Sequence, residues 1–121
     1  MTKEDELFQK GIDAFNNRKF YEAHEYWEEL WLDYKLTDAT FIQGLIQLAV
    51  SYFHLFNNNL TGARSMIRKC LGKFEGVEMV RGMDMNELKK QIDKVQLHFN
   101  NINNSSCIKD SYILILKVLH E

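Results

Sequence analysis

Proline is absent from this chain of 121 residues, and cysteine is scarce. The lack of proline excludes a proline-rich linker or interaction tail and favours helices joined by compact loops. The two cysteines, Cys70 and Cys107, form neither a CxxC pair nor a Cys/His metal-binding spacing. We therefore expect two free thiols in a reducing compartment. Because the opening MTKEDELFQK is polar and is no signal peptide, we expect a cytoplasmic protein.

Net charge is small, and it is unevenly distributed. A value of −2 gives no electrostatic reason to bind nucleic acid or an anionic membrane, so neither is an expected partner. Residues 1–38 carry ten acids and five Lys/Arg, residues 39–63 carry no formal charge, and residues 64–121 carry seven acids and ten Lys/Arg. This asymmetry favours attraction between the two ends of a bundle, or between two copies of the chain.

The uncharged region also contains the membrane candidate, Ala39–Phe56. Four polar side chains interrupt it, more than a lipid-exposed span tolerates. They are Gln43, Gln47, Ser51 and His54. We therefore predict no membrane-spanning helix.

Helical periodicity runs through most of the chain. It predicts helices at about residues 4–16, 20–34, 39–56, 60–74 and 86–100. Ala23 and Ala63 take matching places in two successive helical hairpins, a spacing like that of tetratricopeptide repeats. We predict an all-α fold: a compact five- to six-helix orthogonal bundle with tetratricopeptide-like helical hairpins.

The end of the chain has a different composition. We place a single helical-bundle domain at residues 1–103, and a linker with a short apolar segment at residues 104–121. The polar stretch NNINNSS precedes YILILKVLH, whose pattern fits either a helix or a strand. Because no other strand is evident for it to pair with, we predict a short helix that docks on the core or on a second subunit.

The stretch YEAHEYWEELW, Tyr21 to Trp31, has three faces on a helix. Trp27 and Trp31 lie on the apolar stripe and are predicted core residues. His24 and Glu28 are one turn apart at the edge of this stripe, so the carboxylate can meet the imidazole and orient it. The other glutamates point to solvent: Glu22, Glu25 and Glu29.

The next predicted helix is apolar around most of its girth, with one neutral polar strip. Amides, a hydroxyl and an imidazole form hydrogen bonds without charge, so we expect this strip to face the interior or a cleft. Antiparallel packing of the two helices would bring it opposite His24 and Glu28. The predicted polar pocket then contains Glu25, Gln43, Gln47 and Ser51 beside the candidate catalytic residues His24, Glu28 and His54.

This pocket has three interpretations. It is a hydrogen-bonded network that fixes helix register, a site for a divalent transition metal on His24, Glu28 and His54, or an acid–base centre based on His24 and Glu28. The Glu-x-x-His pairs of di-iron bundles and the HExxH motif are both absent. We favour a non-enzymatic interaction module without a cofactor, whose partner is a second copy or another protein. A metal-dependent or acid–base, hydrolase-like enzyme is the alternative.

Several blocks resemble the small all-helical "domain of unknown function 309" family. They are FYEAHE, WE and W in residues 20–31, FIQGLIQLA from Phe41, His54, and NLTGA from Asn59. The segment RGMDMNEL also resembles a region of that family. The resemblance implies an all-α bundle and no established activity, cofactor or substrate. The family's signature polar positions correspond here to Glu22, His24, Glu25, Glu28, Gln43, Gln47 and His54.

Overall fold

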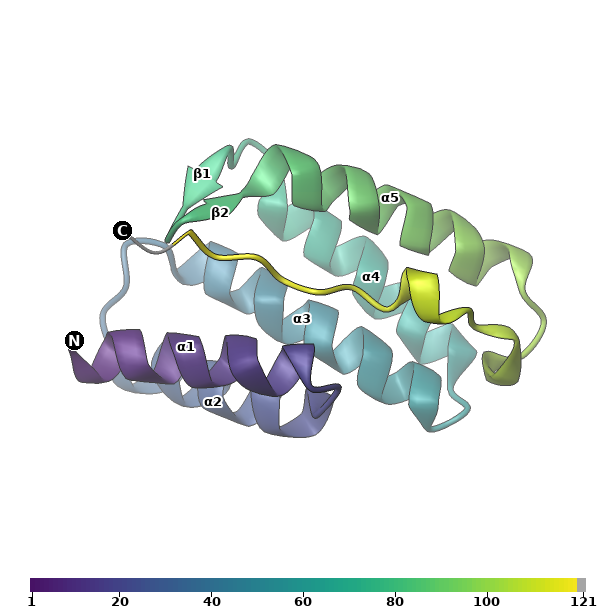
Figure 1. The fold of residues 1–121 in the computed structure, drawn as a ribbon, viewed down its shortest axis with the longest axis horizontal. Helices are drawn as coiled ribbons and strands as arrows, with labels where there is room; N and C mark the ends of the chain where they lie inside the picture. The colour runs from purple at the N-terminus through teal and green to yellow at the C-terminus, as the bar shows by residue number, and fades with distance from the viewer. Residues whose placement is uncertain (120–121) are drawn as a thin grey trace.

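The computed structural model describes residues 1–119 and has five α-helices. Two helical hairpins pack side by side, and the fifth helix lies against the second hairpin (Figure 1). The predicted all-α bundle is confirmed. The elements are α1 (Lys3–Asn16), α2 (Phe20–Asp33), α3 (Ala39–Phe56), α4 (Leu60–Phe74), β1 (Met79–Val80), β2 (Met83–Asp84) and α5 (Met85–Asn101).

Local signals in the sequence fix where the helices begin. Thr2 and Asp5 form a capping box at the start of α1, satisfying backbone N–H groups that the helix cannot use. Asn59 caps α4 through the N–H of Gly62, and Asp84 caps α5 through the N–H of Glu87. These caps explain why the predicted helix starts agree closely with the structure.

Helix α3 is the central helix of the bundle. Half of it is buried, including Leu45, Leu48 and Tyr52, which have no exposed surface. By length and composition alone it could also cross a membrane, and it is the one helix within residues 1–119 with that property. Its packing between α2 and α4 accounts for this apolar composition.

The segment between α4 and α5 turns back on itself as a two-stranded antiparallel sheet. Met79 pairs with Asp84 and Val80 pairs with Met83, with Arg81 and Gly82 in the turn. Both turn residues have positive φ, which glycine adopts without a steric penalty.

A bidentate ion pair ties this turn to the bundle. The Arg81 guanidinium donates to both carboxylate oxygens of Asp38, at 2.6 and 3.2 Å, just before α3. The turn between β1 and β2 is thereby fixed relative to the start of α3.

The final segment of the chain is extended, so the predicted C-terminal helix is wrong over the described residues. Short 3₁₀ turns occupy Ser105–Cys107 and Asp110–Tyr112, and residues 113–119 then run without regular structure (Figure 1). Side chains of α1 and α3 satisfy backbone groups here, so no partner strand is required. The predicted helix also included residues 120–121, which lie outside the described residues.

The two tryptophans of α2 have different environments. Trp27 is fully buried, and its indole N–H donates to the carbonyl oxygen of Phe8 at 3.2 Å. Trp31 retains 38% of its surface exposed, so its predicted place in the core is wrong. Trp31 lies in the last turn of α2, next to the exposed Leu32, where the helix leaves the bundle.

Two buried titratable groups predict a loss of stability at alkaline pH. Burial raises the pKa of the Cys70 thiol from 9.0 to about 12, and burial also raises the pKa of the Tyr52 hydroxyl above its ordinary 10.0. Both ionise first in the unfolded chain, which then binds fewer protons than the folded chain. The free energy of unfolding therefore falls as pH rises above 9.0, by up to about 1.4 kcal/mol per pH unit for each group.

Urea unfolding measured at a series of pH values tests this prediction. Cys70→Ala is expected to make the decline above pH 9.0 shallower, whereas Cys107→Ala should leave it unchanged because that cysteine is exposed. Equal slopes for the wild type and Cys70→Ala would contradict the assignment.

Candidate functional site

The predicted contact between His24 and Glu28 is present on the surface of α2. His24 Nε2 lies 2.6 Å from Glu28 Oε2, with 24% and 46% of the two side chains exposed. Glu25, predicted to border the pocket, is exposed, as are Glu22 and Glu29. The pair is therefore a partly exposed contact between two side chains that are one helical turn apart.

The polar strip of α3 faces α4, not α2. A Cβ on Gly44 would lie 2.5 Å from the Phe74 ring, and a Cβ on Gly62 would lie 3.0 Å from His54 Cδ2. His54 Nδ1 also lies 3.4 Å from Asn59 Nδ2, just before α4. Small residues at the α3–α4 crossing thus let the strip approach α4 closely.

The remaining residues of the strip are satisfied locally or remain unpaired. The Ser51 hydroxyl donates to the carbonyl oxygen of Leu48 at 2.7 Å, and Ser51 is fully buried. Gln43 is half-buried, and the buried Gln47 Oε1 has no hydrogen-bond partner within residues 1–119. The strip is therefore partly buried, as expected, but in the described residues its side chains form no hydrogen bond with α2.

Two aromatic rings lie between the candidate histidines. The Tyr21 ring is 5.6 Å from the His24 ring and 5.5 Å from the Phe53 ring, and Phe53 in turn is 6.1 Å from His54. Nowhere along residues 1–119 do three His, Cys, Asp or Glu side chains form a group that could hold a metal ion. Within residues 1–119, His24, Glu28 and His54 do not form one group of possible metal ligands.

The structure instead brings together a site around the extended residues 113–119, which we call the C-terminal segment. This segment lies between α1 and α5 (Figure 1). Because Ile113, Leu114 and Leu116 are buried there, we call the surface that the segment covers the interhelix groove. The Asn16 side chain on α1 forms two hydrogen bonds with Leu116: its Nδ2 donates to the carbonyl oxygen at 2.9 Å, and its Oδ1 accepts from the N–H at 2.7 Å. One amide side chain thus pairs with the segment as the backbone of a neighbouring strand would.

Tyr52 on α3 makes a second pair of backbone contacts. Its hydroxyl donates to the carbonyl oxygen of Tyr112 at 2.5 Å and accepts from the N–H of Leu114 at 3.2 Å. The Tyr112 ring stacks on His98 of α5 with 4.0 Å between ring centroids. Helices α3 and α5 therefore both hold the beginning of the segment.

The β-turn and the side chains of the segment complete the site. The N–H of Leu119 donates to the carbonyl oxygen of Gly82 at 2.8 Å, and a Cβ on Gly82 would lie 2.5 Å from the Leu119 oxygen. Ile113, Leu114 and Leu116 are buried, whereas Ile115, Lys117 and Leu119 are exposed. From Leu114 onward, this alternation is that of a strand with one buried face.

Sequence reasoning missed the roles of Asn16 and Tyr52. Asn16 stands in NNRK, which indicated only a helix break, and Tyr52 looked like one more apolar residue of a core helix. Neither pattern carries a signal that its side chain binds backbone 60 to 100 residues away. The pattern of YILILKVL fits a strand as well as a helix, but no partner strand was evident to support a strand.

Together these features define a small all-α bundle of two helical hairpins and a fifth helix, with an extended segment seated between its helices. Residues 8–66 match the model of a family described as "Domain of unknown function (DUF309)", so the predicted family is confirmed over that stretch. The match covers part of α1, all of α2 and α3 and the first half of α4. It includes His24, Glu28 and His54, whereas RGMDMNEL and the C-terminal segment lie outside it. No curated protein and no solved structure matches the chain.

Proposed function

We propose that the protein is a non-enzymatic, cytoplasmic interaction module whose interhelix groove holds an extended apolar segment. The observation that carries this proposal is the set of side-chain bonds to backbone made by Asn16 and Tyr52. Such bonds bind the main chain irrespective of its side chains, as in strand-addition modes of peptide recognition. The chain's own C-terminal segment is the occupant in this structure.

The pattern that the groove accepts follows from the burial of this occupant. Apolar side chains enter at the positions of Ile113, Leu114 and Leu116, and the position of Ile115 faces outward. A second copy of the chain carries the same segment, so exchange of C-terminal segments between copies would produce a homo-oligomer. Such exchange would be the docking on a second subunit that we expected for the apolar segment at the end of the chain.

Acid–base chemistry remains a weaker candidate, favoured by the 2.6 Å contact between His24 and Glu28. General acid–base catalysis needs a bound substrate within hydrogen-bond reach of the pair. The Tyr21 ring covers one side of His24, and His54 lies beyond the Phe53 ring. More of the observed contacts support the interaction module than support an acid–base enzyme. The interaction module also requires no bound substrate beside His24 and Glu28.

A peptide added in trans tests the proposed function. In Leu116→Asp, a buried leucine becomes a carboxylate without a partner, so the segment is expected to leave the groove. A labelled peptide with the sequence of residues 110–119 should then bind this variant at least about tenfold more tightly than the wild type. The wild-type groove is already filled by an occupant with a high effective concentration.

The controls separate the groove from general exposure of apolar surface. Adding Asn16→Ala to Leu116→Asp should abolish binding of the peptide, whereas adding Asn17→Ala should not, because within residues 1–119 the Asn17 side chain donates only to the carbonyl oxygen of Asp13. Equal affinity of the peptide for the wild type and Leu116→Asp would count against the proposal. So would equal effects of the two asparagine substitutions.

A further inference from the structure

The C-terminal segment has one bonded edge. Its opposite edge is open at Ile115 and Lys117 and ends at Leu119, whose N–H donates to the carbonyl oxygen of Gly82. The N–H groups of Leu114 and Leu116 point to Tyr52 and Asn16 and are hydrogen-bonded. In an extended chain the intervening residues direct their backbone groups to the opposite side. Within residues 1–119, the N–H groups of Ile115 and Lys117 have no hydrogen-bond partner. An unpaired strand edge of this kind is a template for another extended chain.

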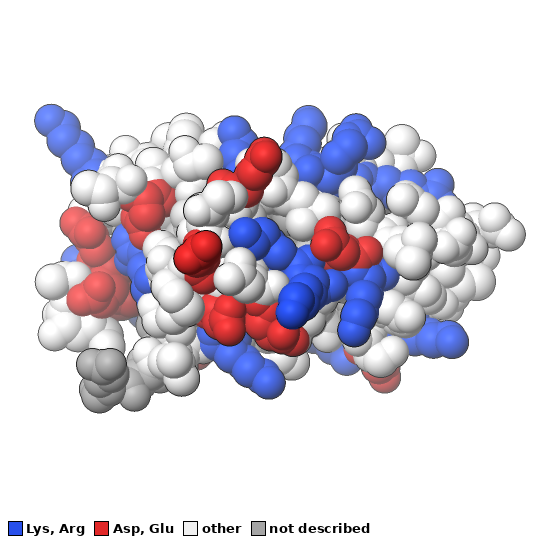
Figure 2. Space-filling model, turned by 90° about the horizontal axis from the view of Figure 1, so that it is seen from above, with Lys and Arg blue, Asp and Glu red and all other residues white. Residues whose placement is uncertain are grey.

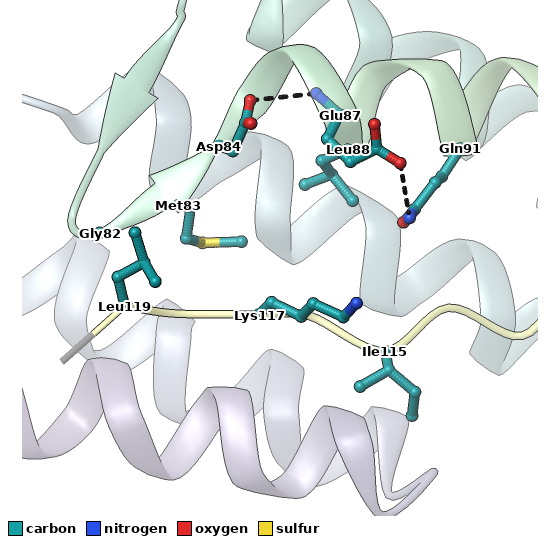
Figure 3. A pocket seen from close by; sticks show the side chains of 9 residues that line it. All are labelled: Gly82, Met83, Asp84, Glu87, Leu88, Gln91, Ile115, Lys117 and Leu119. Atoms are coloured by element: carbon teal, nitrogen blue, oxygen red, sulfur yellow. Dashed lines mark hydrogen bonds between the residues drawn. The ribbon is translucent and has the colours of Figure 1, made fainter.

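A cleft runs along this open edge, between the segment and α5. It consists of two adjoining cavities of about 300 and 440 Å³, which share Gln91, Ile115 and Lys117 in their linings. Figure 3 shows Met83 and Leu88 pointing from β2 and α5 toward the segment, which gives the first cavity an apolar floor. The open edge therefore borders a cleft of the size of a small ligand site and not a flat surface.

The charges of the cleft differ between its two ends. Asp84 and Glu87 line the cavity beside Leu119, whereas Lys94 lines the cavity beside Ser111. Lys117 stands between them and lines both. No salt bridge within residues 1–119 neutralises Glu87 or Lys94. On the face seen in Figure 2, acidic and basic side chains are interspersed. The cleft is thus negative at one end and positive at the other.

We propose that this cleft binds a second extended peptide segment, which pairs antiparallel with Ile115 and Lys117 and carries a cationic residue at its N-terminal end and an acidic residue at its C-terminal end. This inference rests on the seat of the C-terminal segment described under the proposed function, because a displaced segment would offer no edge.

Charge and strand geometry specify the same direction for the partner. The segment runs from the end near Lys94 to the end near Asp84 and Glu87. An antiparallel partner therefore begins beside the two carboxylates and ends beside Lys94. Antiparallel pairing is also slightly more stable per residue than parallel pairing. A partner of about six residues extends roughly 20 Å along the segment, at roughly 3.3 Å for each residue.

The test uses capped hexapeptides with the full-length protein labelled with ¹⁵N. The probe is acetyl-Lys-Thr-Val-Thr-Val-Glu-amide, whose charges are confined to its two terminal side chains. Its control, acetyl-Glu-Thr-Val-Thr-Val-Lys-amide, has the same composition and the reversed charge order. A third peptide is the probe with N-methyl groups at two consecutive central residues, so that an N–H facing the segment is lost whichever register is adopted.

We expect the probe to shift and protect the amides of Ile115 and Lys117 and to bind about tenfold more tightly than its reversed control. The N-methylated peptide should lose this binding. Exchanging the two exposed charges in Glu87→Lys/Lys94→Glu should invert the preference between the two peptides. This variant alters no hydrogen bond to the C-terminal segment, so the seat of the segment is kept.

Equal binding of both charge orders, binding that survives N-methylation, or shifts confined to other amides would overturn the inference. The amides of Leu114 and Leu116 distinguish this failure from failure of the proposed function. If these amides stay protected from hydrogen exchange while the probe fails to bind, the seated segment stands and the second strand is refuted. If they exchange freely, the seat itself is absent and both proposals fall.

Discussion

Replacing Gly11 with alanine is expected to lower the free energy of unfolding by about 3 kcal/mol. A Cβ at this position would lie 2.1 Å from Nε1 of Trp27, a distance at which one of the two groups must move. Trp27 is fully buried and its Nε1 donates to Phe8, so a displaced indole loses both packing and a buried hydrogen bond. Thermal or urea unfolding measures the loss.

Gly72 provides a matched control for this substitution. It also lies within a helix, but a Cβ there would meet nothing within 4 Å. Gly72→Ala is therefore expected to stabilise the protein by up to about 1 kcal/mol, because alanine loses less backbone entropy than glycine. Destabilisation of similar size at both positions would refute the packing explanation, and no destabilisation at Gly11 would refute the contact with Trp27.

Much of the helical framework could be predicted because its signals are local. The apolar period, the Thr2 cap and the Asp84–Glu87 capping pattern lie within a few residues of the structure that they determine. The predicted helix at residues 39–56 ends before three consecutive asparagines, and α3 ends at the predicted residue, Phe56. Local chemistry is enough to place helices of this length, even where their partners are unknown.

The candidate pocket could not be predicted in the same way, because helix orientation is not a local property. Gln47, Ser51 and His54 share one side of α3, as the helical wheel indicated, but that side packs on α4. The close approach of Gly44 to Phe74 and Lys73 fixes this choice. A helical wheel reveals which residues share a face, whereas the neighbouring helix depends on packing across the whole bundle.

The C-terminal segment shows a second limit of sequence reasoning. The rejected strand had no strand partner, and that premise holds: the segment pairs with the Asn16 and Tyr52 side chains instead. Side chains can satisfy backbone groups wherever the fold brings them together. Long-range contacts of this kind leave no periodic pattern in the sequence. The pattern of the segment fits a helix or a strand, and without these contacts the helix was predicted.

Replacing Tyr52 with phenylalanine is expected to release the C-terminal segment while the helices stay folded. The ring, which contacts Phe15, Phe20 and Phe99, is retained, but the hydroxyl that bonds to Tyr112 and Leu114 is lost. The N–H of Leu114 and the carbonyl of Tyr112 then have no partner in the groove, at a cost of about 3 kcal/mol. Hydrogen exchange at the amides of Leu114 and Leu116 should accelerate by about a hundredfold, with exchange in α3 little changed.

Tyr112→Phe is the matched control, because it keeps the stacking on His98 and removes a hydroxyl that has no hydrogen bond in the described structure. Its exchange rates should stay at wild-type values. Because the Tyr52 hydroxyl also titrates, Tyr52→Phe should remove its contribution to the loss of stability at alkaline pH. If Tyr52 acted only through packing of its ring, the substitution would leave the pH dependence of stability unaltered. Acceleration in α3 equal to that in the segment would mean that Tyr52 holds the whole bundle, and the segment would then not be a separable occupant of the groove.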